Sequence, residues 1–480
     1  MRRVDRRQFL SEVSRVAIGL TGSASLLQAA LAQPERSTGR RPNFIFILTD
    51  DLGWGDLGCY GHQSIKTPNL DRLAKQGSLY TQFYVSSGVC SPSRTAFMTS
   101  HFPARHRIHG HLATPEQNAA RGMPNYLDAG VPTITRLLQS AGYATAHFGK
   151  WHLGSGEGAP DPAAYGIDDH RTVNSNGPGW DDEQDVYFRA RSTRLIVDET
   201  IRFVEANRDR PFYVNAWTLL PHALLHPTDE QMAPYRQLAP GGPKFPYKGA
   251  MQIYYASVSD IDQQVGRLME KLDELGLAND TVVLFSSDNG PEDIHIRNAA
   301  HSGVGTPGPF RGRKRSLYEG GVRMPWIVRW PGHVPAGRTD DSTVIGAVDF
   351  LPSVCSMAGV EAPGAVNLDG EDMSAALLGK PKQRAKPLMW EWRFTIAGDV
   401  LNRSPMLSIR DGNWKLLMNP DRSRVELYDI PSDPSELNNL AKKHPDVVKR
   451  LSKRVLEWQA TLPEGPVQPG AGSNAYPWPK

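Results

Sequence analysis

Hydrophobic positions in the first 380 residues fall into two alternating patterns. Short, wholly apolar runs rich in aromatic and β-branched residues predict buried strands, and they lie at 43–48, 143–148, 211–217, 281–286 and 325–330. Longer segments with helical spacing lie between them, at 68–76, 132–141, 193–207 and 250–275. Strands that alternate with helices predict an α/β fold with a large, mainly parallel sheet that is flanked by helices on both faces.

The pattern changes after about residue 380. Segments 388–394, 406–410 and 414–418 have the length and composition of antiparallel strands, and Asp411-Gly412 is typical of a turn between the last two. A helix is predicted over 443–460. We therefore expect an α/β domain over 41–380 and a smaller C-terminal α+β subdomain over 381–480 that contains an antiparallel sheet.

The first 32 residues predict an export signal. Arg6 and Arg7 precede a mildly apolar stretch, 16–31, and small residues at Ala30 and Ala32 fit signal-peptidase cleavage. Glycines and serines make the stretch a poor membrane anchor, and no later run reaches about 18 apolar residues. We expect export by the twin-arginine machinery to the periplasm or beyond, without stable membrane insertion; an amphipathic N-terminal helix is the alternative.

Charge and cysteine content exclude some classes of protein. The net charge of +3 arises from five arginines and two acidic residues within 1–32, so the remaining chain is neutral. A neutral chain lacks the basic footprint of a nucleic-acid-binding protein. Three cysteines are too few for a disulfide framework. Cys59 and Cys355 are expected to pack as free thiols, with a bridge between them as the alternative in an oxidising compartment.

Acidic residues follow two of the predicted strands. Asp50-Asp51 ends the first strand, and Asp288-Asn289 follows the strand at 281–286. Parallel strands bring these side chains to one edge of the sheet, where three carboxylates and an amide oxygen suit Ca²⁺ or Mg²⁺ better than zinc. The alternative is a pair of capping turns. Gly53 and Gly290 are expected to permit the tight turns that follow.

Cys90 lies in a segment that predicts a helix N-terminus. Pro92 marks the start of the helix in Gly88-Val89-Cys90-Ser91-Pro92-Ser93-Arg94, and backbone N–H groups at such a terminus favour anions. An unmodified thiol there has the properties of a nucleophile with a lowered pKa. A buried structural cysteine beside an ordinary helix start is the alternative interpretation of this motif alone.

The same motif, Cys90-Ser91-Pro92-Ser93-Arg94, resembles the signature of type I sulfatases of the arylsulfatase and N-acetylgalactosamine-6-sulfatase kind. In that family the cysteine is oxidised after translation to Cα-formylglycine. Six further segments match in the family's order between about residues 43 and 440: Asp50-Asp51, Lys150-Trp151-His152, Pro221-His222, Ser287-Asp288-Asn289-Gly290, Gly312-Arg313-Lys314, and 433–439. The resemblance implies an alkaline-phosphatase-like fold and hydrolysis of sulfate monoesters, with sulfated carbohydrates as the expected substrates.

The resemblance also implies residue roles. One Ca²⁺ (or Mg²⁺ as the alternative) is bound by Asp50, Asp51, Asp288 and Asn289. The hydrated formylglycine at position 90 is a gem-diol nucleophile, and Arg94 steadies it. Lys150 and Lys314 neutralise the transferring group, His222 is the candidate acid and His152 the candidate base. The modification requires a formylglycine-generating or anaerobic sulfatase-maturing enzyme, and it is expected in the cytoplasm, before export of the folded protein.

Several alternatives and secondary expectations accompany these roles. A phosphonate monoester or phosphodiester hydrolase of the same fold and a non-catalytic glycan-binding homologue are the competing functions. Two departures from the family, Ser100 in place of Gly and Leu224 in place of Pro, concern the helix end and the pocket wall. Arg313 and Arg315 are expected to be solvated or structural, and Glu319 to support the Lys314 loop. The pocket wall is expected from 101–130, 153–190, 291–311 and 391–404, with a histidine of 101–111 as a candidate.

Overall fold

The computed structural model describes residues 41–480 except 176–179, 181–184, 186, 239–248, 297–298, 300, 365–366 and 476–480. The predicted export signal at 1–32 lies outside the described residues. The described residues belong to one compact unit, and the domain boundary at 380 stays a prediction.

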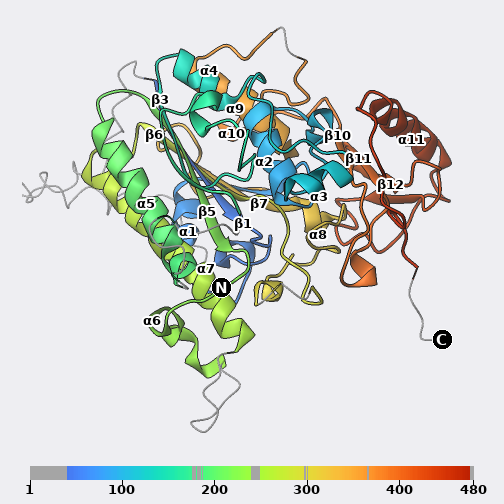
Figure 1. Cartoon of the computed structure of the whole chain (residues 1–480), viewed down its shortest axis with the longest axis horizontal. Helices are drawn as coiled ribbons and strands as arrows, with labels where there is room; N and C mark the ends of the chain where they lie inside the picture. The colour runs from blue at the N-terminus through green and yellow to red at the C-terminus, as the bar shows by residue number, and fades with distance from the viewer. Residues whose placement is uncertain are drawn as a thin grey trace, which may run out of the picture. The chain divides into compact units, whose positions relative to one another are not determined.

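A large mixed sheet forms the centre of this unit (Figure 1). Within the described residues it has nine strands, in the order β4-β3-β5-β1-β6-β7-β2-β8, and β9 pairs with β2. The strands β4, β3, β5, β1 and β6 are mutually parallel, whereas β7 runs antiparallel to β6 and β2. Their bounds are β1 Asn43–Asp50, β2 Ser78–Tyr84, β3 Ala144–Lys150, β4 Asp169–Val173, β5 Phe212–Pro221, β6 Thr281–Ser287, β7 Arg323–Arg329, β8 Arg338–Asp340 and β9 Ile345–Gly346.

Helices cover both faces of the sheet, as Figure 1 shows. Successive side chains of a strand point to opposite faces, so Phe46 packs in one core, 5.0 Å from Phe97 between ring centroids, while Ile47 packs in the other. The helices around Phe46 are α2 Cys90–Thr99, α4 Ile134–Ser140, α9 Phe350–Ala358 and the short α10 Ser374–Leu377. Those around Ile47 are α1 Pro68–Gln76, α5 Phe188–Ala206 and α7 Ala250–Glu274, with α6 Asp229–Met232 beside α7.

The C-terminal part forms a separate antiparallel sheet in the order β10-β11-β12-β13. Its strands are β10 Leu388–Glu391, β11 Leu407–Asp411, β12 Trp414–Met418 and β13 Glu426–Asp429, and α11 Pro445–Gln459 packs against β11 and β12. The predicted fold class is therefore confirmed. The sequence did not reveal β13, nor β2 and β4 in the main sheet; β4 is partly exposed and polar, so it lacks a wholly apolar run.

The glycines after the acidic pairs have a different role from the one predicted. Neither Gly53 nor Gly290 has a positive φ; the residue in the left-handed region is Asp51, at 67°. A Cβ at Gly53 would lie 2.1 Å from the Thr306 carbonyl oxygen, and one at Gly290 would lie 2.1 Å from that of Gly320. The two glycines are needed for close backbone packing beneath the acidic residues.

The end of α2 keeps its turn despite the departure from the family pattern. Ser100 adopts φ 61°, its N–H donates to the Ala96 carbonyl, and its hydroxyl donates to the Val348 carbonyl. The cysteines Cys59, Cys90 and Cys355 are free thiols, as expected for Cys59 and Cys355. Among the described helices, none is both long and apolar enough to cross a bilayer.

Candidate active site

Four neighbouring strands bring most of the predicted site residues to one edge of the sheet. In the order β3-β5-β1-β6, Lys150 ends β3, His222 follows β5, Asp50 ends β1 and Asp288 follows β6. The register pairs Asp50 with Pro221, so the acidic pair and the histidine segment end at the same level. The ends of β1 and β6 therefore lie side by side, as the sequence predicted.

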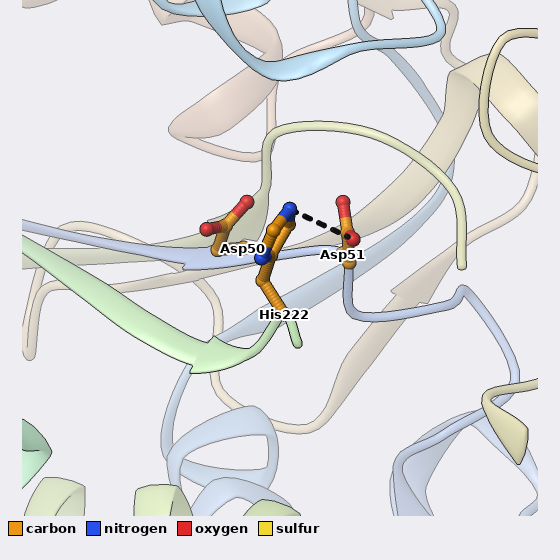
Figure 2. Close-up of side chains that lie close together, drawn as sticks. All are labelled: Asp50, Asp51 and His222. Atoms are coloured by element: carbon orange, nitrogen blue, oxygen red, sulfur yellow. Dashed lines mark ion pairs between the residues drawn. The ribbon is translucent and has the colours of Figure 1, made fainter. Parts of the chain in front are cut away.

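The acidic cluster includes a histidine that we did not predict as a metal ligand. Figure 2 shows His222 between Asp50 and Asp51, with its Nε2 atom 3.8 Å from Asp51 Oδ2. Nitrogen and oxygen atoms of these three residues lie within 4.8 Å of one another. A second group with the same spacing consists of Asp50, Cys90 and Asp288, so Cys90 Sγ borders the cluster directly.

The cluster has the properties of a cation site. Asp50 Oδ1 and Asn289 Oδ1 are buried and, among the described residues, have no hydrogen-bond partner. The Asn289 amide nitrogen donates to Asp51 Oδ1 at 2.7 Å, which leaves the amide oxygen free for a cation. Burial raises the pKa of Asp288 to about 8 against the opposing pull of Arg94, and the charge of Asp50 adds to the rise. Crowded carboxylate and amide oxygens are ligands for Ca²⁺ or Mg²⁺, so the predicted residues fit such an ion.

Two buried lysines pair with the acidic residues. Lys150 Nζ lies 2.6 Å from Asp50 Oδ2, and Lys314 Nζ lies 2.7 Å from Asp51 Oδ2. Burial opposes ionisation of Asp50, but Lys150 and other cations outweigh it and hold the pKa of Asp50 well below its usual range. Burial would likewise lower the pKa of Lys314, yet Asp51 and Glu292 raise it above its usual value. Both lysines therefore place positive charge beside the acidic cluster.

Arg94 joins separate parts of the site. Its Nε and Nη2 atoms donate to Asp288 Oδ2 at 2.9 and 2.7 Å, and Nη1 donates to the Lys150 carbonyl at 2.8 Å. Its guanidinium also lies 5.0 Å from the ring centre of Trp217. Arg94 is completely buried. Its contacts orient Asp288 and the end of β3; its expected role of steadying the modified residue 90 stays a prediction.

The two predicted histidines differ in hydrogen bonding. His152 Nε2 donates to the Leu112 carbonyl at 2.9 Å, and its buried Nδ1 atom has no partner among the described residues. His222 Nδ1 donates to the Ala223 carbonyl at 2.7 Å. Burial is the main cause that lowers the pKa of both imidazoles well below the usual value. The positive charge of Lys150 lowers the pKa of His152 further, and that of Lys314 lowers the pKa of His222 further. Each ring therefore has one nitrogen committed to a backbone carbonyl, and its other nitrogen, Nδ1 of His152 and Nε2 of His222, accepts no hydrogen bond among the described residues.

These residues surround a cavity of about 550 Å³, within the range of small-molecule sites, about 300–1,000 Å³. Cys90, His152, His222 and Lys314 line it, and three of the four expected wall segments contribute, through His111, Ser175, Arg189, Glu292 and Ile296. The fourth segment, 391–404, lines a neighbouring cavity.

Some lining residues were not predicted as site residues. Glu292 is buried, accepts two hydrogen bonds from Arg315, and lies 3.8 Å from Lys314 Nζ. Arg315, expected to be solvated or structural, therefore forms a wall of the cavity. Arg189 Nη2 donates to the carbonyl of His222 at 3.0 Å. Glu292 could have been predicted as a site residue, because it lies two residues after Gly290 of the second acidic segment. No sequence motif identifies Arg189.

Comparisons with known proteins agree with this geometry. The sulfatase family model matches residues 42–360, and a model for the C-terminal part of N-sulphoglucosamine sulphohydrolase matches residues 310–461. Human arylsulfatase A is 30% identical, over 91% of this chain and 92% of its own length. An N-acetylgalactosamine-6-O-sulfatase of Bacteroides thetaiotaomicron is 28% identical, over 92% and 98%.

Solved structures give the same result. The crystal structure of Ps i-CgsB in complex with k-i-k-neocarrahexaose superposes with a TM-score of 0.73 at 26% identity, over 87% of this chain and 93% of that one. The phosphonate monoester hydrolase of Agrobacterium radiobacter shares the fold, with a TM-score of 0.60 at 21% identity over 88% and 96%. From its sequence and its strand-end site, this chain belongs to the sulfatase family and is a sulfuric ester hydrolase.

Proposed function

We propose that this sulfatase hydrolyses sulfate monoesters of carbohydrates, with residue 90 as Cα-formylglycine and with one bound Ca²⁺. The observation that carries the proposal is the position of Cys90. It is the first residue of α2, it borders the cavity that Lys314, His152 and His222 line, and its Sγ atom lies within 4.8 Å of carboxylate oxygens of Asp50 and Asp288. A reactive group at position 90 therefore faces the same cavity as Lys314 and the two histidines.

The cation ligands of the proposal are Asp50, Asp51, Asp288 and Asn289. Two unpartnered oxygens, Asp50 Oδ1 and Asn289 Oδ1, support this assignment. When bound, the ion supplies positive charge that polarises a sulfate oxygen and favours a deprotonated hydroxyl. Arg94 keeps Asp288 oriented through two charge-assisted hydrogen bonds.

Lys150 and Lys314 act on the sulfate group. A sulfate monoester carries one negative charge, and more charge develops on the leaving oxygen as the S–O bond breaks. Lys314 lines the cavity, and Lys150 lies behind it, paired with Asp50. Fixed ammonium groups in a buried site stabilise that developing charge without reorganisation.

The histidines transfer protons. His152 has its Nε2–H committed to the Leu112 carbonyl, so its bare Nδ1 can accept a proton. Hydrated formylglycine supplies a nucleophilic hydroxyl and a second hydroxyl whose deprotonation releases sulfate, which an ordinary cysteine or serine lacks. His222 serves as the acid for the leaving oxygen, and because Nδ1 already donates to Ala223, the transferred proton is carried on Nε2.

A comparison of leaving-group chemistry tests the reaction class. The experiment measures kcat/KM of the purified, modified enzyme for 4-nitrophenyl sulfate and for a phosphodiester with the same aryl leaving group. We expect the higher value for the sulfate ester, and a Cys90→Ala variant should lose both activities. A higher value for the phosphodiester would instead identify a phosphodiesterase or phosphonate hydrolase of this fold. A wild-type enzyme that binds sulfated sugars without turnover would identify a glycan-binding homologue.

The same proposal includes maturation before export. The twin arginines at 6–7 address a folded protein, so the maturing enzyme must reach Cys90 in the cytoplasm. Replacing residues 1–32 by a general secretory signal should lower the fraction of Cys90 converted, as measured by mass spectrometry of the exported protein. An unchanged fraction would contradict this order of events.

A further inference from the structure

A second cavity of about 450 Å³ adjoins the one that contains Cys90. His111 and Arg315 line both cavities, so the two are neighbours. The volume of each cavity falls within the range for a small-molecule ligand. We refer to the second cavity, with walls from 110–121, 392–395 and 466–469, as the side pocket.

The walls of the side pocket are held together by hydrogen bonds. The Gln468 N–H donates to the Arg393 carbonyl at 2.9 Å, and the Thr395 N–H donates to Gln468 Oε1 at 2.9 Å. The Thr395 hydroxyl donates to the Pro469 carbonyl at 3.1 Å. The C-terminal segment is thereby fixed against the loop after β10, so the side pocket is largely preformed.

Among the lining residues, Arg121 and Phe394 are the ones best placed to contact a ligand. Phe394 is partly exposed in it, and the Arg121 guanidinium lies 5.6 Å from the Phe394 ring centre. Arg121 donates one long hydrogen bond, 3.3 Å, to the His111 carbonyl. Among the described residues, no carboxylate forms an ion pair with Arg121. Burial lowers the pKa of Arg121, yet a guanidinium keeps its charge in proteins.

These features match a charged sugar unit. The apolar C–H face of a pyranose packs on an aromatic ring, and a guanidinium binds carboxylate or sulfate through paired, charge-assisted hydrogen bonds. Arg315 differs from Arg121 because Glu292 already holds it through two hydrogen bonds. Arg121 therefore has donors available for a ligand.

We propose that the side pocket binds the sugar next to the sulfated one, and that this neighbour carries an anionic group bound by Arg121. This inference rests on the proposed function, because it places the sulfated sugar in the cavity that contains Cys90. It extends that function in one respect: the preferred substrate is an oligosaccharide with an anionic unit beside the sulfated unit. The anionic group is a carboxylate or a second sulfate, because a guanidinium can bind either one through paired hydrogen bonds.

The test compares substrates that differ only in the neighbouring unit. A panel of sulfated monosaccharides first identifies the sulfated sugar that is hydrolysed. Disaccharides of that sugar are then made with a uronic acid, a sulfated sugar or an uncharged sugar as the neighbour. Values of kcat/KM are measured for the wild type, Arg121→Gln and Phe394→Ala, with Arg72→Gln as a matched control at an exposed arginine that lines neither cavity.

We expect Arg121→Gln to lower kcat/KM on the order of tenfold or more for at least one anionic disaccharide, and to leave the uncharged disaccharide and 4-nitrophenyl sulfate unchanged. A loss with the uronic-acid disaccharide identifies a carboxylate as the group that Arg121 binds, and a loss with the sulfated disaccharide identifies a sulfate. Phe394→Ala should lower kcat/KM for all three disaccharides but not for the aryl sulfate. Arg72→Gln should have the same kcat/KM as the wild type for every substrate.

Equal losses on every substrate, or no loss with Arg121→Gln, would overturn the proposal. A failure of the proposed function looks different, because the wild type would then hydrolyse neither the aryl sulfate nor any disaccharide. In parallel, calorimetry measures the affinity of the wild type and of Arg121→Gln for the same disaccharides. These affinities test the binding claim even if the protein hydrolyses none of the substrates. A tenfold weaker affinity only for anionic neighbours supports it, and equal affinities overturn it.

Discussion

At the scale of single residues, Arg94 carries more contacts in the site than the motif around Cys90 implied. Its guanidinium is wholly buried, binds Asp288 through two nitrogens and binds the Lys150 carbonyl through the third. A lysine offers one point charge in place of this planar fork. Arg94 is thus a positioning residue for a proposed cation ligand and for the end of β3.

We predict that Arg94→Lys lowers kcat/KM for 4-nitrophenyl sulfate about a hundredfold, because charge-assisted hydrogen bonds worth roughly 3 kcal/mol in total are lost. Calorimetry should show weaker Ca²⁺ binding in the same variant. Arg105→Lys is the matched control, since Arg105 also binds a carboxylate, Asp369, through two nitrogens but lines neither cavity. Wild-type Ca²⁺ affinity in Arg94→Lys would contradict the positioning role.

Removal of the cation should affect both stability and activity. Without an ion, Asp50, Asp51 and Asp288 crowd like charges in a buried site, so chelation should lower Tm and abolish sulfate release. We expect Ca²⁺ to restore both at a lower concentration than Mg²⁺, because a site with many protein oxygens suits Ca²⁺, whereas Mg²⁺ usually keeps several of its waters. Full activity in metal-free protein, verified by elemental analysis, would exclude a catalytic cation.

At the scale of elements, the strand ends explain which parts of the site were predictable. Apolar runs identified β1, β3, β5 and β6, and parallel pairing then predicted that Asp50 and Asp288 lie at one edge. Lys150 and His222, at the ends of β3 and β5, were identified from the family resemblance. Other wall residues were harder to predict. Arg121 and Phe394 come together only through packing between segments distant in sequence, and no local pattern encodes that contact. β4 was missed because a partly exposed edge strand lacks an apolar run.

The long helix α7 contains a buried carboxyl group with a testable pH dependence. Asp260 is 6% exposed and accepts a hydrogen bond from Gln231 of α6 at 3.0 Å. Burial raises its pKa to about 6, against the lowering effect of hydrogen bonds from Gln231 and Gln264. The folded protein keeps this proton up to about pH 6, whereas the unfolded chain releases it near pH 3.8. Between these values the folded state binds more protons, so the free energy of unfolding falls as the pH rises.

Asp260→Asn should remove that slope. At pH 4 the variant and the wild type should unfold with similar free energies, and at pH 7 the variant should be more stable, by on the order of 2 kcal/mol. Urea unfolding at several pH values measures the difference, with Asp273→Asn as a control at an exposed position of α7. A difference that stays constant from pH 4 to pH 7 would rule out titration of Asp260.

At the scale of the whole molecule, a buried charge cluster connects the two sheets. Lys415 of β12 lies 2.9 Å from Glu319 and 3.0 Å from Glu436, and all three side chains are fully buried. Glu319 was expected to support the Lys314 loop. It instead accepts hydrogen bonds from Tyr84 of β2 and from Lys415, so it ties the main sheet to the C-terminal sheet.

Lys415→Met should destabilise the protein by about 3–5 kcal/mol, because two buried carboxylates lose their shared cation. Denaturant unfolding followed by Trp fluorescence measures the change. Lys453→Met is the control, since Lys453 forms only an exposed pair with Glu457 at 3.7 Å and such pairs contribute little. If both variants unfolded like the wild type, the cluster would not join the two sheets energetically.

The most direct measurement of the central claim is the mass of the peptide that contains residue 90, from active enzyme purified after co-expression with a maturing enzyme. The account predicts formylglycine at this position, in a fraction that rises in proportion to sulfate release from 4-nitrophenyl sulfate across preparations. Fully active enzyme whose residue 90 is entirely unmodified cysteine would contradict it.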